Sequence, residues 1–337
     1  MILPVFNAER YIAETLESVL AQTHEQWELL LVEDGSTDGS AAIVADYAAR
    51  EPARITLLRH ENGSNRGVSC SRNLALGAAR GALVAFLDAD DVWLPEKLAA
   101  QVACMAAHRE VGVCYCRSQV LREGAGHDWM PGTVILGHEP TDDCRVTVMK
   151  IITVRLNYAF SSVMARTAAV RAVGGFAENL PFQSEDRIML AKVAADHRFW
   201  LVPEVLCRYR AHGTSYTAEV VRERKAPAVF FDMQVRIMKW LRSRPDRRGW
   251  ARQIAHDFVP VSFVRASQCS LNARVLAVVL KAFMGSVLLY PSIPVRLLWR
   301  IVRFPFRRGG LAQALDLMRR SATYRRLRAR GKERVGR

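Results

Sequence analysis

The apolar run Leu83–Leu87, followed directly by Asp88-Ala89-Asp90-Asp91, is the feature that most constrains the fold of this chain. Five consecutive apolar residues predict a strand buried on both faces, as in a sheet that helices cover on each side. Acidic residues at the end of such a strand lie at the edge of a sheet, where ligands bind in open α/β folds. Crowded carboxylates raise one another's pKa unless a cation neutralises them, and oxygen ligands suit Mg²⁺ or Mn²⁺. The alternative is an ordinary turn, since Asp also opens loops and Pro95-Glu96 is typical of a first helical turn.

Strands and helices are predicted to alternate along the first hundred residues. Buried strands are expected at residues 2–5, 27–32, 55–58 and 83–87, and apolar residues recur at helical spacing between them. This alternation indicates βαβ units, so we predict an α/β, Rossmann-like fold with a mostly parallel sheet flanked by helices. Residues 122–145 are rich in Gly, Pro, Asp and His, and are expected to form an irregular surface segment.

The net charge of +15 is distributed unevenly over the 337 residues. Residues 1–219 contain 21 Lys and Arg against 27 Asp and Glu, a balance of −6, whereas residues 220–337 contain 27 against 6, a balance of +21. We therefore predict a first domain for the chemistry, residues 1–217, and a mainly α-helical, basic extension, residues 218–337, that docks on an anionic partner. The seven cysteines form no CxxC pair, which suits a reducing compartment, and no signal peptide is expected.

The basic extension favours a membrane surface over nucleic acid. Residues 273–290 are strongly apolar but fall short of a spanning helix of about 20 residues, which leaves a core helix, a re-entrant segment and an interfacial helix open. Arginines then recur at helical spacing from Arg296 to Arg307 beside apolar and aromatic residues, as in a helix that lies on an anionic membrane. The alternative is a packed helix with a solvated arginine face. No DNA- or RNA-binding motif is present in the sequence, so no specific nucleic-acid partner is predicted.

Polar clusters follow each of the four predicted strands: Pro4-Val5-Phe6-Asn7, Glu33-Asp34-Gly35-Ser36, Asn65–Asn73 and Asp88–Asp91. The carboxyl ends of parallel strands share one edge of a sheet, so these clusters are expected to converge. Asp34 is then a candidate ligand for a base or ribose, and Arg72 for a phosphate. Asp88 and Asp90 are candidates for ribose and metal. Neither the P-loop nor the dinucleotide-binding glycine fingerprint occurs in the sequence.

These clusters resemble the nucleotide-sugar-binding half of the family 2 glycosyltransferases, which have the GT-A fold. The matching stretches are Pro4–Asn7 with Leu16–Thr23, Val32–Asp38, Asn65–Asn73 and Phe86–Asp91, and the similarity resumes at Val173–Phe176, Ser184–Asp186 and Arg208–His212. It covers about two thirds of the chain. Each motif alone is weak evidence for the family, but the occurrence of five of them in the order found in the family is highly specific.

The resemblance implies an inverting transfer from a nucleotide-diphosphate sugar, with a UDP-sugar favoured. The acceptor would be a hydroxyl of a lipid-linked or glycan molecule in cell-surface polysaccharide biosynthesis. By this resemblance the backbone of the first motif (Pro4, Val5 and Asn7) and Asp34 would hold the base, Asp88 would contact ribose, and Asp90, with Asp88, would bind Mn²⁺ or Mg²⁺.

The resemblance also assigns the reacting groups. Asp186 would be the base, with Glu185 as the alternative base or as a residue that tunes it, and Arg210 and His212 belong to a region that closes over the diphosphate. An acceptor hydroxyl needs such a base, and a metal and an arginine can stabilise the departing diphosphate. Without the other motifs, charge at a helix start would be the preferred explanation of Glu185-Asp186. Trp93 and Trp129 are candidates for stacking on an acceptor sugar or for ordinary packing.

We therefore expect a glycosyltransferase that is peripheral at the cytoplasmic face of a membrane. The competing hypothesis is a non-catalytic nucleotide-sugar-binding or membrane scaffold protein with the same fold. Asp90 and Asp186 favour the enzyme, because a binding module needs no base. Only three residues precede Pro4, so the first strand is expected to be short.

Overall fold

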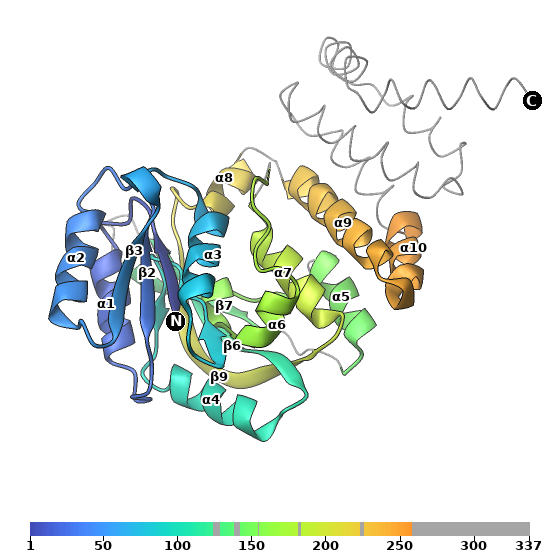
Figure 1. Cartoon of the computed structure of the whole chain (residues 1–337), viewed down its shortest axis with the longest axis horizontal. Helices are drawn as coiled ribbons and strands as arrows, with labels where there is room; N and C mark the ends of the chain where they lie inside the picture. Colours follow the sequence, from blue (N-terminus) through green and yellow to red (C-terminus); the bar gives the residue numbers. More distant parts are fainter. Residues whose placement is uncertain (124–128, 138–141, 154, 181–182, 223–225, 258–337) are drawn as a thin grey trace, which may run out of the picture. The chain divides into compact units, whose positions relative to one another are not determined.

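The computed structural model describes residues 1–123, 129–137, 142–153, 155–180, 183–222 and 226–257 (Figure 1). The chain divides into two compact units. Unit 1 comprises residues 1–179 and 185–215, and unit 2 comprises residues 180–184 and 216–337. All of the site residues predicted from the sequence belong to unit 1.

Three parallel strands open unit 1, in the order β1 (Ile2–Val5), β2 (Leu29–Glu33) and β3 (Ile55–Arg59). Every residue of β2 is buried, as its apolar sequence predicts. Helices α1 (Ile12–Leu20) and α2 (Ser40–Arg50) lie on one side of these strands, and α3 (Val68–Ala78) lies on the other (Figure 1). The predicted βαβ alternation is therefore confirmed here.

A second, six-stranded sheet completes unit 1. Its order is β4-β8-β6-β9-β5, with β7 beside β6. The strands are β4 (Leu83–Ala85), β5 (Val92–Trp93), β6 (Val111–Glu123), β7 (Trp129–Leu136), β8 (Val163–Arg166) and β9 (Arg198–Ala211). The long β6–β9 pair is parallel, whereas the other pairs of this sheet are antiparallel. The α/β class predicted from the sequence is confirmed. The expectation of a mostly parallel sheet holds for β1–β3 but is wrong for the second sheet, because antiparallel pairing depends on long-range contacts that strand-helix alternation does not reveal.

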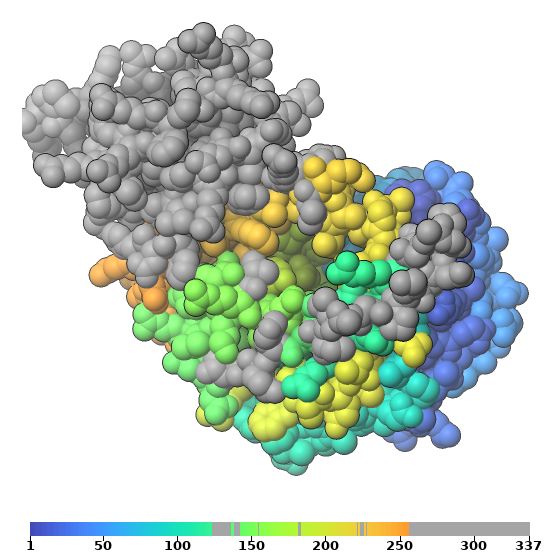
Figure 2. All heavy atoms as spheres, turned by 180° about the vertical axis from the view of Figure 1, so that it is seen from behind, coloured from blue at the N-terminus to red at the C-terminus, as the bar shows by residue number. Residues whose placement is uncertain are grey.

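The helices of this half of unit 1 are α4 (Lys97–Ala107), α5 (Cys144–Ile152), α6 (Thr167–Ala172) and α7 (Glu185–Ala194). Figure 2 shows unit 1 from behind, with the blue N-terminal residues to one side and the teal, green and yellow segments of the second sheet and its helices to the other.

Two strand predictions differ in detail from the structure. The apolar run 83–87 forms a strand only to Ala85, although Phe86 still bridges in parallel to Ile2 and so connects the two sheets. The irregular segment expected at 122–145 is wrong for much of its length, because β6 reaches Glu123 and β7 pairs with it. The pairing of β7 with β6 alone is compatible with Pro131, since proline is tolerated on an edge strand.

The described part of unit 2 is helical, with α8 (Tyr216–Arg222), α9 (Ala226–Ser243), a short 3₁₀ turn at Pro245–Arg247 and α10 (Arg248–Asp257). None of the helices in the described ranges is both long and apolar enough to cross a membrane. The apolar stretch 273–290 and the arginine repeat 296–307, on which the membrane prediction rests, lie outside the described residues.

Candidate active site

Asp34 organises the carboxyl ends of β1 and β2. Its backbone N–H donates to the carbonyl of Val5 at 2.9 Å, and its buried carboxylate accepts hydrogen bonds from the backbone N–H groups of Arg66 (2.7 Å) and Gly67 (2.9 Å). The imidazole Nε2 of His60 lies 3.4 Å from the same carboxylate. The predicted clusters Pro4–Asn7 and Asn65–Asn73 therefore both contact Asp34. This is the convergence expected when parallel strands end at one edge of a sheet.

Asn7 links the same two strand ends through the turn after β2. Its backbone N–H donates to Ser36 Oγ at 3.1 Å, and its side-chain oxygen accepts from Thr37 N at 2.8 Å. Asn7 adopts a left-handed backbone conformation with φ of 49°, which asparagine tolerates better than most residues. Phe6 beside it is exposed over 47% of its surface, which places an accessible aromatic ring near the end of β1.

Arg72 is the buried centre of the acidic part of the site. Its guanidinium donates at 2.6 Å to Asp88 and at 2.6 Å to Glu185, and lies 4.5 Å from the ring centre of Phe160. Burial opposes the charged form of Arg72, but the charges of Asp88 and Glu185 outweigh it and raise its pKa. The prediction that Arg72 meets a phosphate is not tested by the structure, which shows it engaged with two carboxylates.

The carboxylates around Arg72 outnumber it. Burial raises the pKa of Asp88, with Arg72 opposing and Asp90 adding to the shift, and burial likewise raises the pKa of Glu185 against the effect of Arg72. Asp186 contributes to both shifts, so its charge acts on the same cluster. The cluster of Arg72 with Asp88, Glu185 and Asp186 is therefore negatively charged, and an added proton or cation would be stabilised in it.

Glu185 and Asp186 occupy the first turn of α7 but differ in environment. Glu185 is 6% exposed and bound to Arg72, and its Oε2 is buried with no hydrogen-bond partner among the residues that the structure describes. Asp186 is partly exposed. Neighbouring helical residues diverge by about 100°, which matches the expectation that only one of the two faces a substrate. The assignment of the base stays a prediction.

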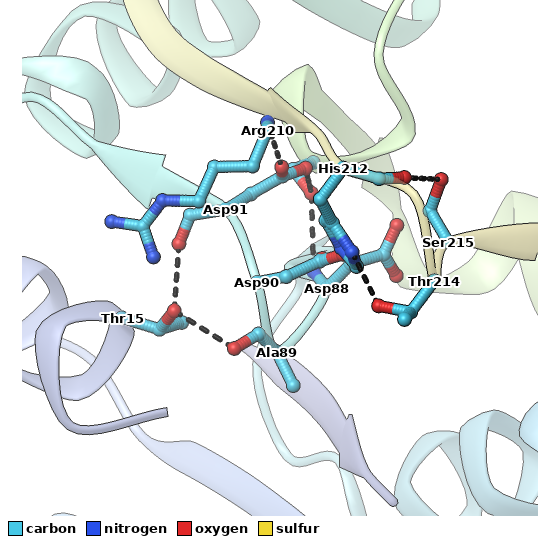
Figure 3. A network of polar contacts seen from close by, with 10 residues as sticks. Thr15, Asp88, Ala89, Asp90, Asp91, Arg210, His212, Thr214 and Ser215 are labelled. Atoms are coloured by element: carbon cyan, nitrogen blue, oxygen red, sulfur yellow. Dashed lines mark hydrogen bonds and ion pairs between the residues drawn. The ribbon is translucent and has the colours of Figure 1, made fainter. Parts of the chain in front are cut away.

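The turn after β4 is joined to the end of β9 through His212 (Figure 3). His212 Nε2 lies 2.9 Å from Asp90 Oδ2, and its Nδ1 lies 2.8 Å from Thr214 Oγ1. Arg210, two residues earlier, has a fully buried side chain that forms an ion pair with Glu14 of α1. The structure therefore places His212 against Asp90, and the roles of Asp90, Arg210 and His212 toward a diphosphate stay predictions.

Asp90 and His212 form a donor set that fits a divalent cation held partly by a substrate. Mg²⁺ typically uses one or two carboxylates and takes its other ligands from phosphates and water. Oxygen ligands also suit Mn²⁺, and imidazole is a common ligand of first-row transition metals. Within the described residues, no group of three or more His, Cys, Asp or Glu is arranged to hold an ion by itself. The protein side chains fit a metal site that a diphosphate would complete.

Two residues central to this site were not singled out from the sequence as site residues, namely Asp91 and Ser161. Asp91 is fully buried, and burial together with the charges of Asp90 and Asp88 raises its pKa well above the usual range. Ser161 belongs to a 3₁₀ turn at Phe160–Ser162, and no sequence motif pointed to it.

Trp93, one candidate for stacking on an acceptor, is 2% exposed and donates its indole N–H to the Ser161 carbonyl at 2.7 Å, so the packing alternative is confirmed. The side chain of Trp129 lies outside the described part of the chain.

Comparison with known proteins decides the family. The family model described as glycosyl transferase family 2 matches residues 1–151. The first 151 residues of this chain belong to glycosyl transferase family 2. The matched range contains the strand ends of β1, β2 and β3 and the acidic turn after β4, which are the elements that gather the predicted donor-binding residues.

Curated glycosyltransferases match about a third of the chain. The chain is 40% identical over 105 residues to WfgD of Escherichia coli, named a UDP-Glc:alpha-D-GlcNAc-diphosphoundecaprenol beta-1,3-glucosyltransferase, which covers 31% of this chain and 40% of the relative. It is 38% identical over 115 residues to the uncharacterized glycosyltransferase alr2836 of Nostoc sp., covering 34% of this chain and 35% of the relative. The matches thus span well under half the length of these relatives.

Solved structures support the fold over a longer range. The crystal structure of Staphylococcus aureus TarS 1–349 in complex with UDP-GlcNAc superposes with a TM-score of 0.63 at 20% identity, covering 88% of this chain and 81% of that chain. The mannosyltransferase PcManGT from Pyrobaculum calidifontis, in complex with GDP-Man and Mn²⁺, matches with a TM-score of 0.52 at 21% identity, covering 93% of this chain and 83% of that chain. These likenesses confirm the predicted GT-A fold.

Proposed function

We propose that this chain is an inverting, metal-dependent glycosyltransferase. It would move a sugar from a UDP-sugar to a hydroxyl of a lipid-linked or glycan acceptor in cell-surface polysaccharide biosynthesis. The observation that carries the proposal is the gathering of Asp88 and the pair Glu185-Asp186 around Arg72 in a chain whose first 151 residues match family 2. Asp90 adds its charge to the same cluster through Asp88. The UDP preference is supported by the names of WfgD and of the TarS complex.

The nucleotide would lie over the ends of β1 and β2. Asp34 holds the loop at Arg66 and Gly67 in place, and it is our candidate for contact with the base together with the backbone of Pro4, Val5 and Asn7. The exposed ring of Phe6 offers a flat apolar surface beside them.

Asp186 is our candidate for the base. It is the more exposed carboxylate of the pair at the start of α7, so it can reach an acceptor hydroxyl, whereas Glu185 is held by Arg72. A carboxylate placed within hydrogen-bond reach of the acceptor hydroxyl can take its proton as the hydroxyl attacks the sugar. Glu185 then keeps Arg72, and through it Asp88, in a fixed position.

Asp90 and His212 would hold the divalent cation, Mn²⁺ or Mg²⁺, with Asp88 close by. When bound, the ion would offset the charge that develops on the departing diphosphate. Arg210, which the Asp91 carboxylate holds by its backbone N–H, would add positive charge on the same side. These residues bind and orient the diphosphate, while the proton moves to Asp186.

The basic extension, residues 218–337, would dock the enzyme on the anionic cytoplasmic face of a membrane. Its charge of +21 over residues 220–337 supports this, because each basic residue near an anionic surface contributes about 1 kcal/mol. In the described helices, Arg244 and Arg247 lie over the rings of Trp240 and Trp250 at 5.1 and 4.6 Å. Tryptophan and arginine together are typical of an interfacial surface.

The decisive experiment is hydrolysis of UDP-, GDP- and dTDP-sugars with Mn²⁺ or Mg²⁺. Wild type should release one nucleotide slowly, and Asp90→Asn and Asp186→Asn should both lose this release. Asp46→Asn is the matched control, because Asp46 lies on the exposed face of α2 and pairs only loosely with Arg50 at 3.7 Å. No hydrolysis by wild type, together with no nucleotide-sugar binding in calorimetry, would favour the scaffold hypothesis.

A further inference from the structure

The carboxylate of Asp91 joins two segments that are distant in the sequence. Its Oδ2 accepts a hydrogen bond of 2.5 Å from Ser161 Oγ. Its Oδ1 accepts one of 2.9 Å from the backbone N–H of Arg210 (Figure 3). Its backbone carbonyl also accepts from Thr15 Oγ1 of α1 at 2.8 Å. The side chain and the backbone carbonyl of Asp91 thus attach the acidic turn, residues Asp88–Asp91, to the 3₁₀ turn at 160–162, to β9 and to α1.

Ser161 extends this connection to the other end of the acidic turn. Its Oγ donates to Asp91 and accepts the backbone N–H of Asp88 at 3.1 Å. The hydroxyl therefore holds the first and last residues of Asp88–Asp91 at a fixed separation. The position of Asp90, which lies between them, follows from this constraint.

The connection to β9 determines where His212 lies. Arg210 N is bound to Asp91, and two residues later His212 Nε2 lies 2.9 Å from Asp90 Oδ2. Asp90 and His212 come from separate elements. Asp91 follows Asp90 directly in the chain, and its carboxylate accepts the backbone N–H of Arg210, two residues before His212. Burying a carboxylate next to two others is costly in free energy, so its presence here calls for a role beyond turn formation.

We propose that Asp91 is a positioning residue that sets the distance between Asp90 and His212, and so the affinity of the site for a metal-bound nucleoside diphosphate. This inference rests on the proposed function for the ligand, but the positioning itself is a property of the ligand-free protein. The two can be tested separately.

The test compares Asp91→Asn and Ser161→Ala with Gln22→Met. Asparagine has the shape of aspartate but places an N–H₂ group or a neutral oxygen against Ser161. Gln22 is a matched control, because it is buried and makes three hydrogen bonds at distances of 2.9 to 3.1 Å to Ser18, Leu94 and Leu98, none of them to the acidic turn.

The first readout is amide hydrogen exchange of the protein without ligand. Asp91→Asn should speed exchange at both Asp88 and Arg210, and Ser161→Ala should speed it mainly at Asp88. Gln22→Met should leave both amides at the wild-type rate even where it lowers the melting temperature. Unchanged exchange at both amides in Asp91→Asn and in Ser161→Ala would overturn the proposal, and Ser161→Ala alone serves if Asp91→Asn does not fold.

The second readout is calorimetric binding of UDP in the presence of Mn²⁺. Loss of a hydrogen bond to a charged group predicts binding about tenfold weaker in Asp91→Asn, and turnover should show a raised apparent KM for Mn²⁺ with a smaller change in kcat. Wild-type affinity in Asp91→Asn despite faster exchange would also overturn the proposal. Absence of binding to the wild type would contradict the proposed donor, while the exchange experiment would still decide the positioning role.

Discussion

Arg72 donates a hydrogen bond of 2.6 Å from its Nη1 to Oε1 of Glu185, a residue 113 positions further along the chain. The bond connects α3 to the first turn of α7, and both side chains are almost fully buried. A second bond of 2.6 Å from the same guanidinium holds Asp88. A single cation therefore places the carboxylate that follows β4 beside the acidic pair that starts α7.

Replacing Arg72 with an uncharged residue should lower the free energy of unfolding, because Arg72 is the buried cation that pairs with Asp88 and Glu185. Arg72→Met leaves buried carboxylates without their cation, and breaking a buried ion pair costs about 3–5 kcal/mol. Arg72→Lys keeps the charge but cannot reach both carboxylates with a planar fork, so it should cost less. Urea unfolding monitored by fluorescence measures both costs. Equal stability of the two variants would contradict an ionic role.

Substitutions of Glu185 and of Asp186 should have different effects on kcat. Asp186→Asn should lower kcat by at least about a hundredfold and leave the donor dissociation constant unchanged, because general base catalysis contributes about 10²–10⁴ in rate. Glu185→Gln keeps an oxygen for Arg72 and should have a smaller effect on kcat, with lower stability. Steady-state kinetics and donor calorimetry give both quantities, and the reverse ranking would make Glu185 the base.

Lys97 should make stability depend on pH in the alkaline range. Its ammonium is fully buried, lies 3.9 Å from the ring centre of Trp93 and donates to Gln101 at 2.6 Å. Burial lowers the pKa of Lys97 below its usual 10.5, so between the lowered pKa and pH 10.5 the unfolded chain binds more protons at this residue than the folded one. This residue's contribution to stability is therefore complete above pH 10.5 and is lost as the pH falls through the lowered pKa.

The variant Lys97→Met removes that contribution. The free energy of unfolding of the variant, relative to wild type, should fall as the pH rises from about 7 to about 10, by up to about 1.4 kcal/mol per pH unit. Unfolding curves at several pH values for both proteins measure the difference. Parallel pH profiles would show that the lysine titrates alike in the folded and unfolded states.

A side chain at Gly35 should be more destabilising than one at Gly63, because Gly35 combines a positive φ with close neighbours around its Cα. Both glycines have positive φ, +75° and +60°, so alanine pays about 1–2 kcal/mol at either position. A Cβ at Gly35 would also lie 2.7 Å from Asn65 N and 2.8 Å from Gly63 O, whereas one at Gly63 meets nothing within 4 Å. Gly35→Ala should therefore be less stable than Gly63→Ala and should weaken nucleotide binding, as measured by urea unfolding and calorimetry. Equal effects would mean that the loop at 63–65 shifts without cost.

Much of the N-terminal fold was predictable because its signals are local. Apolar runs such as Leu29–Val32 are buried wherever a sheet forms, and polar residues after parallel strands share one edge, so the meeting of Asn7, Asp34 and the loop before α3 followed from order alone. Edge strand β7 was missed because its Pro and Gly obscure the strand pattern, while its pairing with β6 is a long-range effect.

The amino-acid sequence by itself determined the class of fold, the family and the identity of the acidic residues, since these depend on residue type and on spacing along the chain. The tertiary structure alone decided how those residues are divided: Glu185 is buried against Arg72, Asp90 faces His212, and Asp91 is bound to Ser161 and Arg210. Each of these pairs spans at least 70 positions of the chain. Contacts of that range arise only when two sheets and their helices pack together, because no local pattern of charge or hydrophobicity encodes which carboxylate meets which partner.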